Sequence, residues 1–298
     1  MPNDVTIKQM RAFDAVVRAG SVQQAADEMR LTQPAVTIAI QAFEATMGLE
    51  LFHRRQGRLA PNEDGRRLHA RVKSILTMSE EMQATARNQP LQGTLKVGAA
   101  TTIGNYIMPA VCASFIAAHP EVRIELVVAP SVRILEEVDN INLDLGFVES
   151  PNTRPTIDSR AWFEDRLVVF ARRGHRLTKK RKLRLADLKD ETWLVQRRGS
   201  TTRNALLPFV LDSLSTINIG LETDSLEAIK KTAALGDAIG CLAHSAIDRE
   251  LKSGELVKLD VADFRLTRSY YAIIRKARYQ GTVQTSFLKL VDGFVKKL

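Results

Sequence analysis

Cysteine and long apolar runs are scarce in this chain. Only Cys112 and Cys241 occur among the 298 residues, and neither belongs to a Cys-x-x-Cys pair, which argues against a disulfide framework or a zinc site. We expect both to be buried small hydrophobic residues. No segment approaches the roughly 18 apolar residues of a membrane span, and Met1–Asp4 has no basic region followed by an apolar one. A soluble, cytoplasmic protein with no membrane partner is therefore expected.

Motifs for enzymatic chemistry are also lacking. The five histidines show no spacing typical of a catalytic triad. Ser200 is a candidate nucleophile, but no Gly-x-Ser-x-Gly elbow surrounds it. An enzyme is thus the least favoured function, and we expect no catalytic residues, no cofactor and no metal.

Positive charge is what the chain has in excess. Its net charge of +9 favours an anionic partner such as nucleic acid or phosphate. Residues 1–92 carry only 12 Lys or Arg against 10 Asp or Glu, so the excess does not lie at the N-terminus. The local density is highest in residues 51–73, where seven basic residues stand against two acidic ones.

The segment Ser21–Thr37 has the start signals of two short helices joined by a tight turn. Ser21 is a suitable N-cap for the first helix, with Gln24 three residues later as in a capping box. Thr32 is a suitable N-cap for the second helix, and Pro34 lies in its first turn, where a missing N–H costs little. The pattern predicts a helix-turn-helix whose second helix enters the DNA major groove.

Side chains at the start of the second helix can reach base edges, by hydrogen bonds or by apolar contact with thymine. We expect this set to be Thr32, Gln33, Pro34 and Thr37. Ser21, at a helix N-terminus, can accept a phosphate, although capping alone is the alternative role for Ser21 and Thr32. Residues 51–61 suggest a basic hairpin, or wing, that contacts phosphates or a minor groove through Arg54, Arg55 and Arg58.

A long helix is predicted from Asn62, its cap, to about Asn88. Apolar or small residues spaced 4-3-4-3-4 form a heptad seam, typical of a dimerising helix; they are Leu68, Val72, Ile75, Ser79, Met82 and Ala86. Packing of this face on the chain's own domains is the alternative. Residues 89–93 suggest a hinge.

Beyond Gly93 strands and helices alternate, which predicts parallel sheets with crossover helices. A first block covers strands 95–98, 122–128 and 143–148, with helices 103–118 and 132–140. A second block covers strands 166–171, 193–196, 217–222 and 238–242, with helices 204–214 and 225–235; strand 268–274 and helix 284–297 close the chain. Two similar blocks suggest two subdomains with a cleft between them.

Residues 7–65 resemble the winged helix-turn-helix of LysR-type transcriptional regulators, and the resemblance continues along the whole chain. The matching elements are Phe13, Gly20-Ser21, Ala25-Ala26, the Leu-Thr-Gln-Pro-Ala-Val-Thr of residues 31–37, Glu44, Gly48, Leu51-Phe52, Arg54 and Gly65. Thr37, Phe43 and Ala60-Pro61 depart from the usual Ser, Leu and Leu-Thr. Residues 98–109, 144–149 and 199–203 are similar to the branch of CbbR, CysL and YeiE-like regulators.

The resemblance implies an α/β protein with an all-α-rich winged helix-turn-helix, a long linker helix, and a two-subdomain α/β effector domain like that of periplasmic binding proteins. The implied domains are 1–61, 62–92 and 93–298, the last divided into 93–164 with 268–298 and 165–267. Such a protein is a sequence-specific regulator controlled by a small anionic or metabolite effector. Its expected partners are double-stranded DNA, RNA polymerase and copies of itself, as a homodimer or homotetramer.

Within the resemblance, the effector is expected between the two subdomains. Thr101 and Thr102 follow a strand and begin a helix, so they form an anion site from one side. A matching cluster from the other side consists of Ser200, Thr201, Thr202 and Arg203. Strand-end residues expected to line the same cleft are Ser131, Glu149, Thr223 and Ser225.

Two questions stay open at this level. Both threonine clusters have ordinary helix capping as an alternative role. Glu149, beside an anion, must be protonated, bridge through water, or pair with Arg203.

A cytosolic small-molecule-binding protein of the solute-binding type is the alternative function, and the N-terminal 92 residues argue against it.

Overall fold

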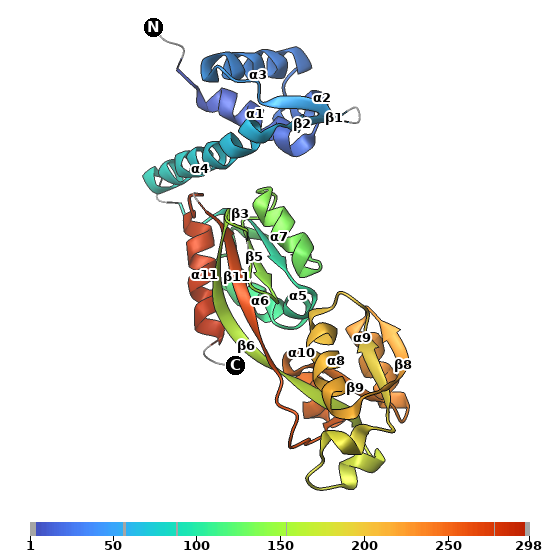
Figure 1. Ribbon diagram of the computed structural model, residues 1–298. Helices are drawn as coiled ribbons and strands as arrows, with labels where there is room; N and C mark the ends of the chain where they lie inside the picture. The colour runs from blue at the N-terminus through green and yellow to red at the C-terminus, as the bar shows by residue number, and fades with distance from the viewer. Residues whose placement is uncertain (1–3, 56–57, 88, 153, 277, 296–298) are drawn as a thin grey trace.

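The computed structural model describes residues 4–55, 58–87, 89–152, 154–276 and 278–295. A small helical N-terminal domain is followed by one long helix and then by an elongated C-terminal domain made of two subdomains (Figure 1). Within the described residues, none of the helices is both long and apolar enough to span a membrane.

Three helices form the N-terminal domain: α1 (Ile7–Ala19), α2 (Val22–Met29) and α3 (Gln33–Met47). The predicted caps are present, because the Ser21 hydroxyl accepts from Gln24 N and the Thr32 hydroxyl from Ala35 N, both at 3.4 Å. Arg30 ends α2 with φ 55°, and this left-handed residue makes the turn between α2 and α3 tight. The helices close over a core that includes Phe13, Val16, Ala25, Val36 and Phe43.

The hairpin of β1 (Phe52–Arg55) and β2 (Arg58–Pro61) packs beside this core. Leu59 N donates to Gly20 O at 3.0 Å, which fixes the hairpin to the turn between α1 and α2. Gly65 follows at a close approach, since a Cβ there would meet Leu51 O at 2.2 Å.

Helix α4 (Glu63–Ala86) begins at Asn62, whose side chain accepts from Gly65 N at 2.8 Å. Its first turns belong to the N-terminal domain, because Val72 and Leu76 are buried in that core and Leu68 packs against it. The predicted heptad seam is therefore wrong for its first half, where tertiary packing takes Leu68 and Val72. Further along α4 the seam residues Ile75 and Met82 are exposed.

A buried hydrogen bond between His69 and Asp14 ties α4 to α1. His69 Nε2 lies 2.8 Å from Asp14 Oδ1, and Arg18 Nε lies 2.9 Å from Asp14 Oδ2. Burial alone would raise the pKa of Asp14, but the hydrogen bonds from His69 and Arg18 and the charges of His69 and Lys73 outweigh it and lower the pKa to about 2. Because the folded pKa is depressed, this contribution to stability is present above the usual pKa of 3.8 and is lost as pH falls toward 2.

One sheet path runs through the C-terminal domain in the order β4-β3-β5-β11-β6-β9-β7-β8, with β10 paired to β6. The strands are β3 (Gly93–Ala99), β4 (Val122–Val128), β5 (Leu145–Val148), β6 (Ile157–Arg172), β7 (Thr192–Gln196), β8 (Asn218–Thr223), β9 (Ile239–Ala243), β10 (Leu256–Lys258) and β11 (Thr267–Arg275). Strand β6 belongs to both subdomains: its first part pairs with β11 as far as Arg166, and its second part pairs with β9 from Leu167. Strands β6 and β11 therefore form the connection between the subdomains (Figure 1).

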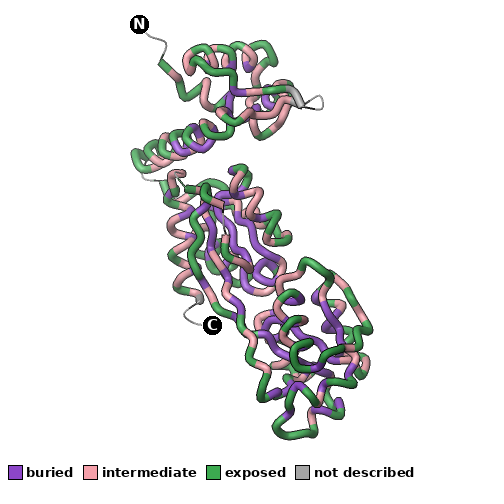
Figure 2. The backbone as a smooth tube through the Cα atoms, in the orientation of Figure 1, coloured by how far each residue is buried: buried purple, intermediate pink, exposed green. Residues whose placement is uncertain are grey.

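Helices pack on the sheet in both subdomains. Those of the first subdomain are α5 (Thr101–Tyr106), α6 (Met108–Ala118), α7 (Ser131–Asp139) and α11 (Thr282–Val295); those of the second are α8 (Thr201–Leu214), α9 (Leu226–Leu235) and α10 (His244–Ser253), with short 3-10 turns at Arg176–Lys179 and Leu185–Leu188. The predicted helix 103–118 is two helices that meet at Ile107, and α10 was not predicted. Buried residues form a separate core in each unit, as Figure 2 shows along the strands.

The two cysteines are unpaired, and burial raises the pKa of both thiols. Cys241 is fully buried in β9, and Cys112 is half-buried in α6. Reactive thiolate chemistry is disfavoured at both positions.

Candidate functional site

The N-terminal end of α3 presents the side chains that the sequence singled out. Thr32, Gln33 and Pro34 are exposed. Thr37 is half-buried, and its hydroxyl donates to Gln33 O at 3.0 Å, which leaves the oxygen lone pairs and the methyl group for other contacts. Ile38 beside it is 65% exposed, so this face of α3 is not covered by the rest of the domain.

Ser21 is the N-cap of α2, because its hydroxyl accepts from Gln24 N, so its capping role is observed. The backbone of the wing pairs Arg55 with Arg58 across the hairpin. The side chains of Arg54, Arg55 and Arg58 lie outside the part of the structure that is described, as do residues 56–57. Their expected phosphate contacts therefore stay predictions.

A second group of polar side chains meets where the two subdomains join; we call it the cleft cluster. Its members are Thr102, Glu149, Asp165, Thr201, Thr202, Arg268 and Tyr270. Arg268 lies at its centre, with Nη2 at 3.0 Å from Thr102 Oγ1 in the first subdomain and Nη1 at 2.7 Å from Thr202 Oγ1 in the second. One guanidinium thus links the subdomains.

The same guanidinium contacts the remaining members. Arg268 Nη1 lies 3.2 Å from Thr201 Oγ1 and 3.4 Å from Glu149 Oε2, and the Thr201 hydroxyl also donates to Glu149. Tyr270 Oη accepts from Arg268 Nη2 at 2.9 Å and donates to Asp165 Oδ2 at 3.1 Å. The hydrogen bonds form one continuous network across the join.

Electrostatics keep the network charged. The Arg268 side chain is only 7% exposed. Burial would lower its pKa, but Tyr270, Glu149 and Asp165 outweigh that effect and raise it. Burial raises the pKa of Tyr270, so the phenol stays protonated and can donate to Asp165.

Of the three alternatives left open for Glu149, pairing with Arg203 is not observed in the structure. Arg203 Nη1 binds Glu222 Oε1 at 2.6 Å and Gln196 O at 3.1 Å. The physical reason is helical geometry, since Arg203 follows Thr202 by about 100° around α8 and so cannot share its direction. The carboxylate of Glu149 is bound by Arg268 instead.

Other members of the predicted effector set have local roles. Ser200 caps α8 by accepting from Arg203 N at 3.4 Å, and Ser225 caps α9 by accepting from Ala228 N at 3.2 Å. Thr223 accepts from Ser225 N at 3.2 Å. Ser131 accepts from Glu149 N at 3.1 Å and so positions that residue.

On the opposite side of the join, Thr102 points into the cluster, whereas Thr101 is half-buried beside it. The N-cap of α5 is Ala100, so neither threonine caps that helix. Of the predicted effector residues, the structure brings together Thr102, Glu149, Thr201 and Thr202.

Sequence reasoning missed Arg268, Asp165 and Tyr270. A sequence signal was the alternate spacing of Arg268, Tyr270 and Ala272, which puts them on one face of the predicted strand 268–274. The structure shows that this face is buried. A charged residue at the inward position of a strand needs a partner. That alternation indicates a buried polar site without telling which residues complete it.

A second polar contact joins the subdomains away from the cleft cluster. Tyr106 Oη donates to Glu227 Oε1 at 2.8 Å. Lys230 Nζ binds Glu227 at 2.6 Å and Glu250 at 2.9 Å, and it lies 4.7 Å from the centre of the Tyr106 ring. Tyr106 belongs to the first subdomain and the other three residues to the second, so the join is held at two places.

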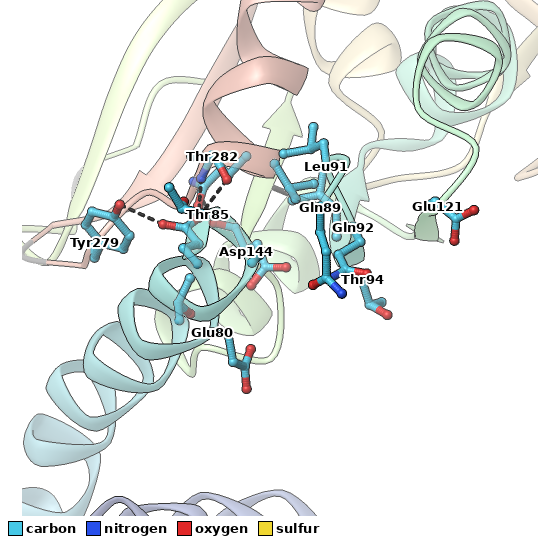
Figure 3. A pocket seen from close by; sticks show the side chains of 18 of the residues that line it. Glu80, Thr85, Gln89, Leu91, Gln92, Thr94, Glu121, Asp144, Tyr279 and Thr282 are labelled. Atoms are coloured by element: carbon cyan, nitrogen blue, oxygen red, sulfur yellow. Dashed lines mark hydrogen bonds between the residues drawn. The ribbon is translucent and has the colours of Figure 1, made fainter. Parts of the chain in front are cut away.

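A cavity of about 670 Å³ lies where α4 meets the first subdomain (Figure 3). At its edge Glu81 of α4 accepts from Tyr279 Oη at 2.7 Å and from Thr282 Oγ1 at 2.9 Å. In Figure 3 Tyr279 and Thr282 both point toward α4. Ser74 adds a contact by accepting from Tyr279 N at 3.0 Å, so the junction is defined by side-chain hydrogen bonds.

Among the described residues, no group of three or more His, Cys, Asp or Glu side chains is placed to hold a metal ion.

Comparison with known proteins covers both halves of the chain. Residues 7–66 match the family described as bacterial regulatory helix-turn-helix protein, lysR family, and residues 88–294 match the LysR substrate binding domain. The chain is 33% identical over 288 residues to the HTH-type transcriptional regulator YeiE of Escherichia coli K12, covering 97% of each chain.

Solved structures have the same architecture. A full-length variant of OxyR from Pseudomonas aeruginosa superposes with a TM-score of 0.74 at 19% identity, covering 98% of this chain and 95% of that one. The regulatory domain of CcmR from Synechocystis PCC6803, in complex with 2-PG, superposes with a TM-score of 0.63 at 28% identity, covering 70% of this chain and 99% of that one.

Proposed function

The chain belongs to the LysR family of DNA-binding transcriptional regulators, which combine a helix-turn-helix domain with an effector-binding domain. From this membership we propose which of its residues read DNA, bind the effector and join the subunits. We assign residues 1–61 to DNA binding, 62–92 to the linker and 93–298 to effector binding. We propose that the protein acts in the cytoplasm on promoter DNA, contacts RNA polymerase there, and has no enzymatic activity.

The exposed start of α3 carries the proposal for DNA reading. Thr32, Gln33, Pro34 and Thr37 lie on the first turns of the second helix of the helix-turn-helix, which is the part that faces base edges in this motif. Ser21 at the start of α2 and the wing arginines Arg54, Arg55 and Arg58 would contact phosphates on either side. Gln33 has the side chain best suited to a bidentate contact with adenine.

Replacing Gln33 by alanine should weaken binding to the operator by roughly 10- to 100-fold, because a good base contact is worth about 1–3 kcal/mol. Binding to unrelated DNA should change by less than about twofold, since phosphate contacts are kept. Fluorescence anisotropy with operator and scrambled duplexes at one salt concentration measures both. Equal losses on the two duplexes would show that Gln33 does not read bases.

The effector site is proposed at the cleft cluster. The observation that carries it is Arg268, a buried cation that contacts threonine hydroxyls from both subdomains. A ligand held there by Thr102 on one side and Thr202 on the other would control how the subdomains close. The 2-PG complex of the CcmR regulatory domain supports a small-molecule ligand in a domain of this fold, and the buried cation favours an anionic one.

Removing the two bridging hydroxyls tests this site. Inorganic phosphate, sulfate, bicarbonate and nitrate are the probes, and any of them that raises the melting temperature of the wild type should no longer do so in a protein with Thr102→Val and Thr202→Val. Valine keeps the shape of threonine and removes the hydrogen bond. Operator binding without ligand should stay within about threefold of wild type. Thr101→Val is the matched control and should keep the response. A double variant that responds like the wild type contradicts an effector site at the cluster.

Self-association is proposed through α4. The contacts of α4 define three faces: one enters the N-terminal core, and another, with Ser74 and Glu81, meets the C-terminal domain. The third face is exposed and apolar, with Ile75 at 40%, Met78 at 47% and Met82 at 67% exposure. Pairing of this face between two copies would give a dimer, and two dimers would give the tetramer.

A further inference from the structure

The charges of the cleft cluster do not balance. Arg268 contributes one positive charge, whereas Glu149 and Asp165 contribute two carboxylates. Arg203, the nearest basic residue in sequence to the threonines of α8, is bound to Glu222 instead. A site with an excess carboxylate is unfavourable for an anion that brings only negative charge.

Glu149 has one oxygen in use and one that is not. Its Oε2 accepts from Thr201 and Arg268. Its Oε1 is buried and has no hydrogen-bond partner among the described residues. The side chain is only 10% exposed, so solvent is largely excluded from it as well. A buried carboxylate oxygen without a partner is costly, so a donor in that position would be strongly favoured.

The threonines offer the opposite kind of group. The oxygens of Thr102 and Thr202 accept from Arg268, and each hydroxyl therefore keeps its own proton for donation. Donation is strengthened because the guanidinium polarises both hydroxyls. The cluster thus presents two hydroxyl donors, Thr102 and Thr202, and one carboxylate acceptor, Glu149, which is connected to them through Arg268.

We propose that the cleft cluster selects oxyanions that carry a proton, such as hydrogen phosphate or bicarbonate, over oxyanions that carry none. The O–H of the ligand donates to Glu149 Oε1, while its other oxygens accept from Thr102 and Thr202 and share the charge of Arg268. A fully deprotonated oxyanion presents only lone pairs to Glu149, so it meets like charge and leaves the orphan oxygen unsatisfied. The inference rests on the proposed effector site and names the ligand class.

Two pairs of ions separate the effect of the ligand's O–H on affinity from the effects of charge and shape. Hydrogen phosphate and sulfate are both tetrahedral dianions, and bicarbonate and nitrate are both planar monoanions; in each pair only the first carries an O–H. Titration calorimetry with the full-length protein near neutral pH should give an affinity at least about 100-fold higher for the first member, because an unmet buried partner costs that much or more.

Glu149→Gln should remove the preference. Its amide can donate to a deprotonated oxyanion, so sulfate and nitrate should gain affinity and the ratio within each pair should fall below about tenfold. Glu255→Gln, a change at an exposed carboxylate, is the control and should keep the wild-type ratios. The wild-type comparison itself needs no variant, so it stands even if Glu149→Gln folds poorly.

The outcomes separate the inference from the proposed site. Equal affinity within both pairs in the wild type, or a preference that survives in Glu149→Gln, overturns the selection of protonated oxyanions and leaves the anion site standing. Failure of all four ions to bind the wild-type protein overturns both the inference and the anion site.

Discussion

Replacing Arg268 by methionine should lower the melting temperature of the effector domain by roughly 6 to 20 °C. The change removes the only cation of the cleft cluster and leaves Glu149 and Asp165 buried without a counter-charge. Breaking a buried pair in this way costs about 3–5 kcal/mol, and each kcal/mol shifts the melting temperature of a domain of this size by roughly 2–4 °C. Differential scanning calorimetry of the full-length protein measures the shift.

The charge argument also predicts a partial rescue. Adding Glu149→Gln to Arg268→Met removes one of the two unpaired carboxylates, so the double variant should melt higher than Arg268→Met alone. Arg265→Met is the matched control, because Arg265 is exposed in the loop just before β11 and its loss should have little effect. A loss of less than about 2 °C for Arg268→Met, or no rescue, would mean that Arg268 is not the counter-charge of this cluster.

The second large effect is expected on assembly. Met78→Glu together with Met82→Glu should convert the oligomer into monomers, because both side chains lie on the exposed apolar face of α4 and paired glutamates would repel. Operator affinity should then fall by roughly 100-fold or more, since two linked helix-turn-helix modules bind with far higher effective concentration than one. Sedimentation velocity and operator binding give the two readouts.

Gln83→Glu adds the same charge on another face of α4 and serves as the control, since Gln83 is exposed but off the apolar face. It should leave both mass and affinity as in the wild type. An oligomer that persists in the Met78→Glu, Met82→Glu protein would place the subunit contact elsewhere.

Local sequence signals were enough for the helix-turn-helix. The N-caps at Ser21 and Thr32 and the proline in the first turn of α3 act on residues only a few positions away. The helix starts that they predict are therefore the ones observed for α2 and α3. The family resemblance is confirmed by the matches to both LysR domains. The alternation of strands and helices likewise predicted the α/β architecture, because it depends on hydrophobic period alone. The prediction of parallel sheets was wrong for β6 and β11, which pair antiparallel with their neighbours, so the sheet is mixed.

Signals that depend on long-range packing failed or stayed incomplete. The heptad spacing could not show that Val72 is buried in the core of the N-terminal domain. Spacing defines which residues share a face of the helix, but not which part of the protein packs against that face. The threonines of the cleft were predicted from their places after strands, but Arg268 was not, since it reaches them from 166 and 66 residues away in sequence. Pairing with Arg203, one of the three alternatives for Glu149, is not observed for the same reason, since Arg203 binds Glu222.

The sequence by itself determined the helix-turn-helix, the two-part α/β domain and the family, because each of these is specified by caps, periods and motifs within short stretches. Only the tertiary structure decided which cation lies in the cleft, which carboxylate oxygen is left without a partner and which face of α4 stays exposed. Those features arise where β11, α5 and α8 meet and where α4 packs on two domains at once, and charge balance at such a meeting point depends on distances in space that no local pattern contains.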